Sequence, residues 1–314
     1  DHTYWVDTAR DDAGGTVEGC TDNLPNKGCT LRQALAFAAS DGGTSEIRFR
    51  IPANSSDPDY GYSNNVWTIK LESPLPPLAE GDLTIIGASS FFVPHRIVID
   101  GSALSGASAI GLRITSPRNR IQQMAFVNFD SSGTNGIGIQ ISGAAAQENE
   151  IIDSMVSGNT QAGIKIDTGA SKNVIKSEGG LSIISGNGTG ILLEGANENT
   201  IQGNLIGLTL GTNSFVALPN TGDGIWLNSS NNNTIGGEFE ERNIISGNTK
   251  SGVLLSNGSA NNTLFGNLIG TDDLGTTAIP NGQGGVQIIN GANNNTITGS
   301  TFTQSIISGN TGYG

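Results

Sequence analysis

The sequence repeats itself, and this repetition constrains the fold more than any other feature. Three short patterns recur in a fixed order: a glycine followed by alternating aliphatic residues, an asparagine two residues before Ile or Leu, and a closing Ile-Ser-Gly-Asn or Asn-Leu-Ile-Gly. The glycine-led pattern begins at Gly136, Gly163, Gly190, Gly224, Gly252 and Gly285. Each pattern is too short for a helix and alternates as a strand with one buried face does.

Three short strands per round, always in one order, predict a parallel β-solenoid. Equivalent strands of successive rounds must run side by side in the same direction, so each round stacks on the last at about 4.8 Å. The aliphatic residues then fill the interior, and a right-handed path is the expected hand of parallel crossover connections. The predicted fold class is therefore all-β: a right-handed parallel β-helix with three strands per coil.

The recurrent asparagines are predicted to form a ladder along the axis. Stacked Asn side chains can hydrogen-bond to one another and to the backbone of the next coil. Asn and Gly also tolerate the left-handed backbone that a sharp bend between strands requires. We therefore interpret this column as structural. It consists of Asn149, Asn173, Asn199, Asn233, Asn262 and Asn295.

A longer period of 62 residues groups the coils in pairs, as the separation of Asn233 and Asn295 shows (295 − 233 = 62). One coil of each pair carries a long excursion after its third strand, at 208–223 and 271–284. Adding the same period to Gly252 gives Gly314, the last residue. The solenoid at 46–314 is therefore expected to be cut inside a coil, and completion of the last coil by something else is the alternative.

Residues 1–45 precede the clear repeats and are predicted to cap the solenoid. A helix at 30–39 with Thr30 as N-cap would be amphipathic and would plug the open end of the bore. Cys20 and Cys29 lie in a loop-like stretch with no nearby histidine pair to complete a zinc site. A local disulfide in a secreted protein is expected, and two reduced thiols in a cytosolic protein are the alternative.

The cap and the repeats resemble a known family. Trp5-Val6-Asp7-Thr8 and Cys29-Thr30-Leu31-Arg32-Gln33-Ala34 are similar to the N-terminal CSLREA-type segment of bacterial secreted surface proteins, with Thr for Ser and Gln for Glu. The Ile-Gly-Thr-Asp stretch at 269–272 and the Ile-Ser-Gly-Asn runs resemble the right-handed parallel β-helix repeats that follow that segment. The resemblance implies an exported bacterial protein and carries no agreed activity.

Charge and hydropathy exclude two classes of partner. A formal charge of −13 repels phosphate backbones and anionic membrane surfaces, so nucleic acid is not an expected partner. No apolar run approaches the roughly 20 residues that a membrane span requires, which argues against direct membrane insertion.

Familiar catalytic arrangements are not visible. The chain has only two histidines, and we find no Ser-His-Asp arrangement and no metal-ligand spacing. Asp272 and Asp273, on the second excursion, are the best acidic pair. A solvated turn tip is the expected interpretation, and a Ca²⁺ site, the one cofactor considered, is the alternative, because that ion needs about six oxygen ligands.

Positive charge gathers in the first coils, where it could hold an anionic glycan. The residues concerned are Arg48, Arg50, Arg96, Arg113, Arg118 and Arg120. The alternative is that they are ordinary outward-facing strand positions, as Arg48 and Arg50 would be between inward aliphatic and aromatic neighbours.

The middle residues of the glycine-led strands should face outward. Leu192, Trp226 and Leu254 would then form an apolar stripe on successive coils, flanked by Lys165 and Gln287. The neighbouring excursions could cover this stripe, which we favour, or it could contact sugar rings or another protein.

Two functions follow from these patterns. The preferred one is an extracellular structural or adhesive surface protein, a rigid rod that contacts polysaccharide or other surface proteins and can associate end to end through open strand edges. The alternative is a polysaccharide lyase or glycoside hydrolase acting on an anionic polysaccharide, with the early arginines or the Trp226 stripe as its binding surface.

Overall fold

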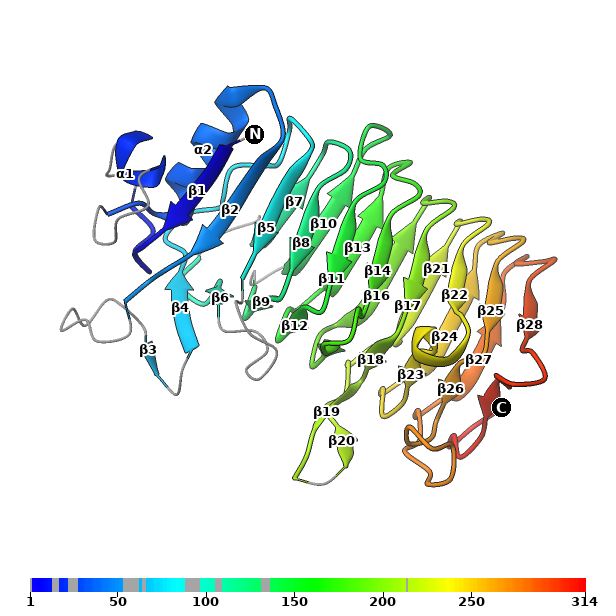
Figure 1. Ribbon diagram of the computed structural model, residues 1–314. Coiled ribbons are helices and arrows are strands. Elements are labelled where there is room, and N and C mark those ends of the chain that lie inside the picture. The colour runs from blue at the N-terminus through cyan, green and yellow to red at the C-terminus, as the bar shows by residue number, and fades with distance from the viewer. Residues whose placement is uncertain are drawn as a thin grey trace.

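A stack of coils runs from the N-terminal to the C-terminal end of the chain (Figure 1). The computed structural model describes residues 2–12, 17–21, 28–52, 62–63, 66–87, 97–104, 109–130, 136–212 and 214–314. The stack has three long sheets, A, B and C. From β7 (Ile110–Ile114) onward each coil gives one strand to sheet C, then one to sheet A and one to sheet B. Corresponding strands of successive coils pair in parallel, which confirms the predicted β-helix.

The strands of each sheet follow the axis in order. Sheet A contains β1 (His2–Val6), β2 (Ser45–Phe49), β5 (Leu83–Ile86), β8 (Arg120–Gln122), β11 (Glu150–Ile152), β14 (Val174–Lys176), β17 (Thr200–Gln202), β22 (Thr234–Gly236), β25 (Thr263–Phe265) and β28 (Thr296–Thr298). Sheet C contains β7 (Ile110–Ile114), β10 (Ile137–Ser142), β13 (Ala162–Asp167), β16 (Thr189–Glu194), β21 (Ile225–Asn228), β24 (Ser251–Ser256) and β27 (Gly284–Ile288). Sheet B contains β3 (Tyr62–Ser63), β4 (Val66–Lys70), β6 (Ile97–Asp100), β9 (Met124–Val127), β12 (Met155–Ser157), β15 (Ser182–Ser185), β18 (Asn204–Ile206), β23 (Ile244–Ile245), β26 (Leu268–Ile269) and β29 (Ile306–Ile307).

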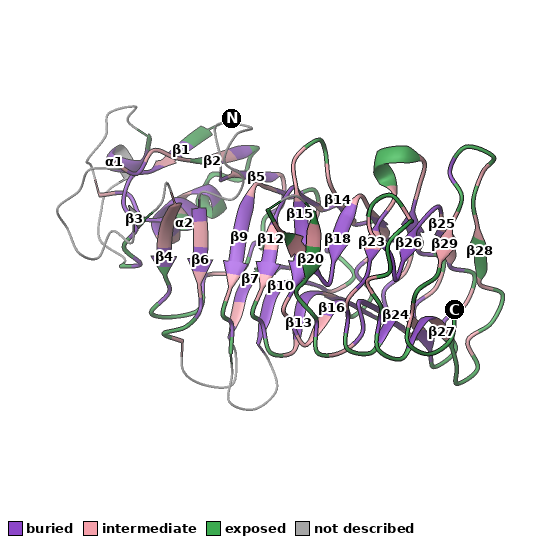
Figure 2. Ribbon diagram, turned by 90° about the horizontal axis from the view of Figure 1, so that it is seen from below, coloured by how far each residue is buried: buried purple, intermediate pink, exposed green. Residues whose placement is uncertain are grey.

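Like residues occupy one column along the axis. Ile164 pairs with Ile191, Ile191 pairs with Ile225, and all three side chains are 0% exposed. Sheets A and B send equivalent columns into the same bore, through residues such as Ile175 and Ile184. Figure 2 shows buried residues along the strands and exposed residues mainly in the connecting turns. The bore is therefore one continuous apolar core.

Asparagines form three ladders where the sequence predicted one. The expected column stands at the turn from sheet C to sheet A, where each Nδ2 group donates to the Oδ1 of the next Asn, from Asn119 to Asn295. A second ladder lies at the turn from sheet B to sheet C, and a third at the turn from sheet A to sheet B. The second contains Asn159, Asn187, Asn220, Asn248, Asn281 and Asn310. The third contains Asn204, Asn243 and Asn267.

The explanation of these asparagines by left-handed backbone was wrong. In the first ladder the left-handed residue is the one before each Asn: Glu148, Lys172 and Glu198 have φ of 57°, 58° and 59°. The Asn residues themselves are not among the residues with positive φ. Their role is to hydrogen-bond to the next coil, and the bend is made by the neighbour.

The leading glycine of the sheet C strands is required by close packing. In β10 this position is held by Gly138 and not by Gly136, because Ile139 pairs with Ile164. A Cβ atom on Gly163 would lie 2.8 Å from Asn187 Nδ2 and 3.0 Å from Ile184 Cγ2, both inside the bore. Gly190 repeats this arrangement, with Asn220 Nδ2 at 2.9 Å. The recurring glycine therefore leaves room for the second ladder.

The N-terminal end is covered by two helices, α1 (Val17–Thr21) and α2 (Leu31–Asp41), and by strand β1. The helix expected at 30–39 is α2, and Thr30 caps it. Thr30 Oγ1 accepts from the Gln33 N–H at 3.3 Å, and the Thr30 N–H donates to Gln33 Oε1 at 3.1 Å. It packs against β1 and β2, and β1 pairs in parallel with β2. Cys20, in α1 (Val17–Thr21), is joined to Cys29 by a disulfide, as expected.

Candidate functional site

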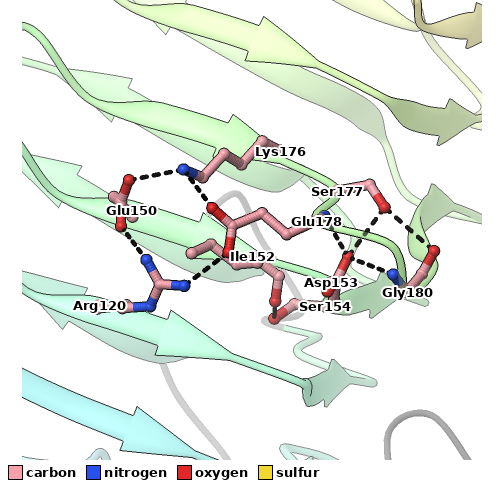
Figure 3. Close-up of polar contacts among 9 residues, drawn as sticks. All are labelled: Arg120, Glu150, Ile152, Asp153, Ser154, Lys176, Ser177, Glu178 and Gly180. Atoms are coloured by element: carbon pink, nitrogen blue, oxygen red, sulfur yellow. Dashed lines mark hydrogen bonds and ion pairs between the residues drawn. The ribbon is translucent and has the colours of Figure 1, made fainter. Parts of the chain in front are cut away.

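Charged side chains on the outer face of sheet A form one ion-pair network (Figure 3). Arg120 pairs with Glu150 on the next coil and with Glu178 at 2.7 Å. Lys176 lies 2.8 Å from Glu150 and 2.7 Å from Glu178. The hydrogen bond from Lys176 is the main cause that lowers the pKa of Glu178. Both cations of this network are therefore neutralised by carboxylates of this chain.

Other early arginines are paired in the same way. The guanidinium of Arg118 hydrogen-bonds to both carboxylate oxygens of Asp82, at 2.7 and 2.6 Å. That interaction lowers the pKa of Asp82. Arg48 pairs with Glu46 of its own strand. Surface pairs of this kind contribute little to stability, but they occupy the charge that was expected to face a glycan.

The arginines also fail to share one surface. Arg50 lies 5.6 Å from the ring centroid of Trp5, at the N-terminal end. Arg113 is exposed on sheet C, whereas Arg120 belongs to sheet A. Arg96 lies outside the described residues. Arg48 and Arg120 lie on sheet A with Arg118 just before it, whereas Arg50 is largely buried and Arg113 lies on another sheet. The described arginines therefore do not form one free basic surface.

The two acids of the second excursion have different surroundings. Asp272 Oδ1 accepts hydrogen bonds from the N–H groups of Thr276, at 2.8 Å, and Thr277, at 3.1 Å. The bond from Thr277 is the main cause that lowers the pKa of Asp272 to about 2. Asp273 is exposed and lines a cavity described below. In the described part of the chain, no three His, Cys, Asp or Glu side chains gather as a group that could hold a metal ion.

The predicted apolar stripe is present on sheet C. Leu192 pairs with Trp226, and Trp226 pairs with Leu254. Leu192 is 6% exposed, and Trp226 is half-buried with its Nε1 donating to Ser256 Oγ at 2.9 Å. The indole is thus fixed across the sheet toward the next coil.

The excursions cover a different face, so the expectation that they shield the Trp226 stripe was wrong. Sheet B has its own outward apolar column, paired rung by rung. Its members are Met155, Ile183, Leu205, Ile244, Leu268 and Ile306. Leu208 and Phe215, in the hairpin of β19 (Leu208–Leu210) and β20 (Phe215–Ala217), pack against Ile183 and Leu205. The hairpin leaves directly after sheet B and therefore folds back on that sheet.

A second set of insertions lies at the turn from sheet A to sheet B. Two coils make this turn through one glycine, Gly203 or Gly266, followed by a ladder Asn. The coils between and beside them carry longer insertions at 177–181, 237–242 and 299–304. The last two touch across the intervening coil: Ser300 Oγ donates to Glu238 Oε2 at 3.0 Å. These insertions form a ridge along one edge of the stack.

A cavity of about 480 Å³ lies between the insertions 177–181 and 237–242. Leu205, Ile244 and Leu268, three rungs of the outward column of sheet B, form its apolar part. Gly203 lies between its walls, where a Cβ atom would be 2.8 Å from Glu240 O and 3.2 Å from Ser177 Cβ. The hollow therefore exists because this coil has no insertion of its own.

The first wall is a turn held by Asp153. Its Oδ1 accepts hydrogen bonds from Ser177 Oγ at 2.9 Å, Glu178 N at 2.8 Å and Gly180 N at 3.2 Å (Figure 3). Asp153 is 2% exposed, so a buried carboxylate fixes the turn. The same turn places Glu178 in the ion-pair network and Ser177 in the cavity lining.

The second wall presents an exposed aromatic ring and a cation. Phe239, in the 3-10 helix η2 (Phe239–Glu241), is 60% exposed and has a left-handed φ of 44°. Its N–H donates to Thr303 Oγ1 at 3.3 Å. Arg242 donates from Nε to Gly266 O at 2.8 Å and from Nη2 to Gln304 O at 3.1 Å. Backbone oxygens thus hold the guanidinium, and the described residues place no carboxylate in an ion pair with it.

Sequence reasoning missed this cavity, although a signal was present. Six residues, 237–242, separate Gly236 from Asn243, whereas Gly203 and Gly266 make the equivalent turn alone. Aligning the coils on their third ladder would have revealed the insertion. Of the earlier candidates, only Asp273 lines the cavity.

The stacked parallel sheets define the chain as a right-handed parallel β-helix repeat protein. Residues 181–302 match the family model described as the right handed beta helix region. No curated protein matches the sequence.

Three solved structures match most of the length of this chain. The mannuronan C-5 epimerase AlgE6 A-module of Azotobacter vinelandii is 16% identical, with 90% of this chain and 93% of that chain covered and a TM-score of 0.30. The AlgE4 A-module of the same organism is 15% identical, with 94% and 98% covered and a TM-score of 0.29. A double mutant of the periplasmic alginate epimerase AlgG is 17% identical, with 86% and 75% covered and a TM-score of 0.28. Similarity at this level assigns neither an activity nor a residue to this chain.

Proposed function

We propose that this protein is an extracellular structural or adhesive protein, in which the β-helix is a rigid rod that contacts polysaccharide or other surface proteins. The observation that carries the proposal is the set of continuous Asn ladders. In the first ladder alone, six successive Nδ2 groups donate to the next coil. Because every rung is bonded to its neighbours, the coils cannot bend or slide independently.

The electrostatics of Arg118, Arg120 and Asp272 support a contact role rather than the enzymatic alternative at these three residues. A lyase or glycosidase acting on an anionic polymer needs free cations to hold the substrate and a carboxyl or base to transfer protons. Arg118 and Arg120 are instead paired with carboxylates of this chain. Asp272 is held by backbone N–H groups, and its lowered pKa is unsuited to a general acid at neutral pH.

Two features support an exported location. The disulfide between Cys20 and Cys29 suits an oxidising compartment, and the N-terminal segment resembles that of bacterial secreted surface proteins. Within the described residues, no helix has both the length and the apolar character needed to cross a membrane. We place the rod at the bacterial cell surface, with glycans as its expected contacts.

The proposal is tested by separating binding from turnover on a panel of polysaccharides. The purified protein is incubated with neutral and uronate polymers, and the solution is assayed for new reducing ends, unsaturated uronates and changed epimer ratio. Retention of the protein on one or more polymers or on intact cells, with every polymer chemically unchanged, is the expected result.

A catalytic result would overturn the proposal. Turnover of any polymer that disappears in Arg113→Ala or Asp272→Ala would show that these residues act on substrate. Electron microscopy of the same preparation gives an independent test of shape, since a rigid rod must appear as particles of uniform length without bends.

A further inference from the structure

We propose that the cavity between the insertions 177–181 and 237–242 is a binding site for a neutral pyranose unit of a glycan. The inference rests on the proposed adhesive function and specifies where contact occurs and which class of sugar is bound. Its volume of about 480 Å³ falls within the usual range of small-molecule sites, roughly 300 to 1,000 Å³.

The lining matches the two-sided chemistry of a sugar ring. A pyranose has apolar C–H faces and a rim of hydroxyl groups. Leu205, Ile244 and Leu268 provide an apolar surface across three coils, and the exposed ring of Phe239 stands beside them. Arg242 supplies hydrogen-bond donors, and Glu240 and Asp273 supply acceptors for the hydroxyl rim.

The charge of the lining selects against uronates. It contains one cation, Arg242, and two carboxylates, Glu240 and Asp273, so its formal charge is −1 (1 − 2 = −1). The whole chain carries −13. An anionic sugar would enter a negative site on a negative protein, whereas a neutral sugar pays no such electrostatic cost.

The position of Phe239 is the observation that most supports a binding role for this cavity. A left-handed backbone is unfavourable for a large side chain, and such strain persists only where the surroundings impose it. Here the Glu238 cap, the bond to Thr303 and the anchoring of Arg242 impose it. The result is an aromatic ring that stays 60% exposed on the rim instead of packing inward.

The next gap along the ridge is bridged by hydrogen bonds between the two insertions. Between the insertions 237–242 and 299–304, Arg242 reaches Gln304 O and Ser300 reaches Glu238. Between 177–181 and 237–242, Gly203 N donates to Glu241 O, and Ser177, Gly203 and Phe239 line the cavity. Side-chain hydrogen bonds therefore bridge the second gap, and a cavity lies in the first.

The test is calorimetric titration of the intact chain with cellohexaose, maltohexaose, laminarihexaose and, as the anionic probes, hexamers of mannuronate and galacturonate. We expect at least one neutral hexasaccharide to bind, at least tenfold tighter than either uronate hexamer. Phe239→Ala should weaken that binding at least tenfold, and Phe239→Tyr should retain it. Phe302→Ala is the matched control, because Phe302 is 83% exposed on the equivalent insertion 299–304 and does not line the cavity.

Each outcome decides the proposal. Circular dichroism and thermal melting must show that Phe239→Ala and Phe302→Ala fold like the parent. Arg242→Gln provides a second cavity variant, which removes the charge and keeps an amide donor. Equal binding by parent and Phe239→Ala would overturn the cavity site while leaving the adhesive function standing. Tighter binding of a uronate hexamer, or no binding of any hexamer, would also overturn it. Cleavage or epimerisation of a probe would instead overturn the proposed function itself.

Discussion

Asn233 Oδ1 accepts two hydrogen bonds from Asn199, one from the backbone N–H at 2.8 Å and one from Nδ2 at 3.2 Å. Asn199 Oδ1 in turn accepts the same pair from Asn173, at 2.9 and 3.0 Å. Each amide side chain therefore satisfies the backbone and the side chain of the coil before it. Since both Asn199 and Asn233 are 1% exposed, water cannot replace a missing partner.

Replacing one ladder residue should therefore destabilise the stack strongly. Asn199→Ala removes the acceptor for two donors of Asn173, and buried donors without partners each cost roughly 1–3 kcal/mol. We expect the free energy of unfolding to fall by about 3 kcal/mol, measured by urea denaturation followed by circular dichroism. Asn293→Ala is the control, because Asn293 is exposed and should change stability by less than about 0.5 kcal/mol. Equal effects at the two sites would contradict the ladder interpretation.

A methyl group on a leading glycine should also be costly. In Gly190→Ala the new Cβ would collide with the carbonyl oxygen of Gly224 and approach Ile206 Cγ2 to 3.1 Å. We expect a loss of at least about 2 kcal/mol, because a packed interior resists added volume. Gly43→Ala, where a Cβ would meet no atom within 4 Å, should leave the melting temperature unchanged.

At a left-handed turn residue, we expect a substitution that raises the free energy of unfolding. Glu198 is exposed and has φ of 59°, a conformation that costs about 1–2 kcal/mol for a residue with a side chain. Glu198→Gly should raise the free energy of unfolding by about 0.5 kcal/mol after the entropy of the unfolded glycine is subtracted. Thr200→Gly, two residues later in β17, should instead lower it by about 1 kcal/mol. A loss in Glu198→Gly would show that the bend does not strain the chain.

Asp223 should make stability depend on pH. It is 5% exposed, and burial raises its pKa, although Ser251 N–H donates to its Oδ1 at 2.9 Å. A carboxyl group whose pKa is raised by folding favours the folded state fully at pH below its unfolded pKa, and this contribution is lost as pH rises through the folded pKa. Asp223→Asn should therefore be more stable than the parent at pH 7, and the difference should vanish below about pH 4. Urea denaturation of both proteins at pH 7 and below about pH 4 measures this difference in the free energy of unfolding.

The interior of the fold could be predicted because its determinants repeat. Ile164, Ile191 and Ile225 were expected to share one column, and they do so because every coil presents the same alternation to the bore. The second ladder was not foreseen, because Asn220 and Asn281 end excursions and follow prolines instead of the Ser-Gly pair found before Asn187. Strand β1 (His2–Val6) was also missed, since five residues without a repeat carry no period.

The candidate site could be predicted only in part. Asp273 was identified as an exposed acid, but nothing in the local sequence indicates that it lies beside Phe239 and Leu205. That proximity depends on which face the excursions fold against, and the outward column of sheet B decides it through tertiary packing. Arg120 pairs with carboxylates of later coils because the strand register places them beside it. That register cannot be deduced from the composition.

The ridge of insertions has a consequence for how such a protein can change in length during evolution. Contacts such as Ser300 with Glu238 join positions 62 residues apart and pass over a coil that has only Gly266 at that turn. Loss or gain of a single coil would place two coils with insertions next to each other, or two coils without insertions. Duplication or deletion of a whole double round preserves the alternation, so we expect related proteins to differ by even numbers of coils.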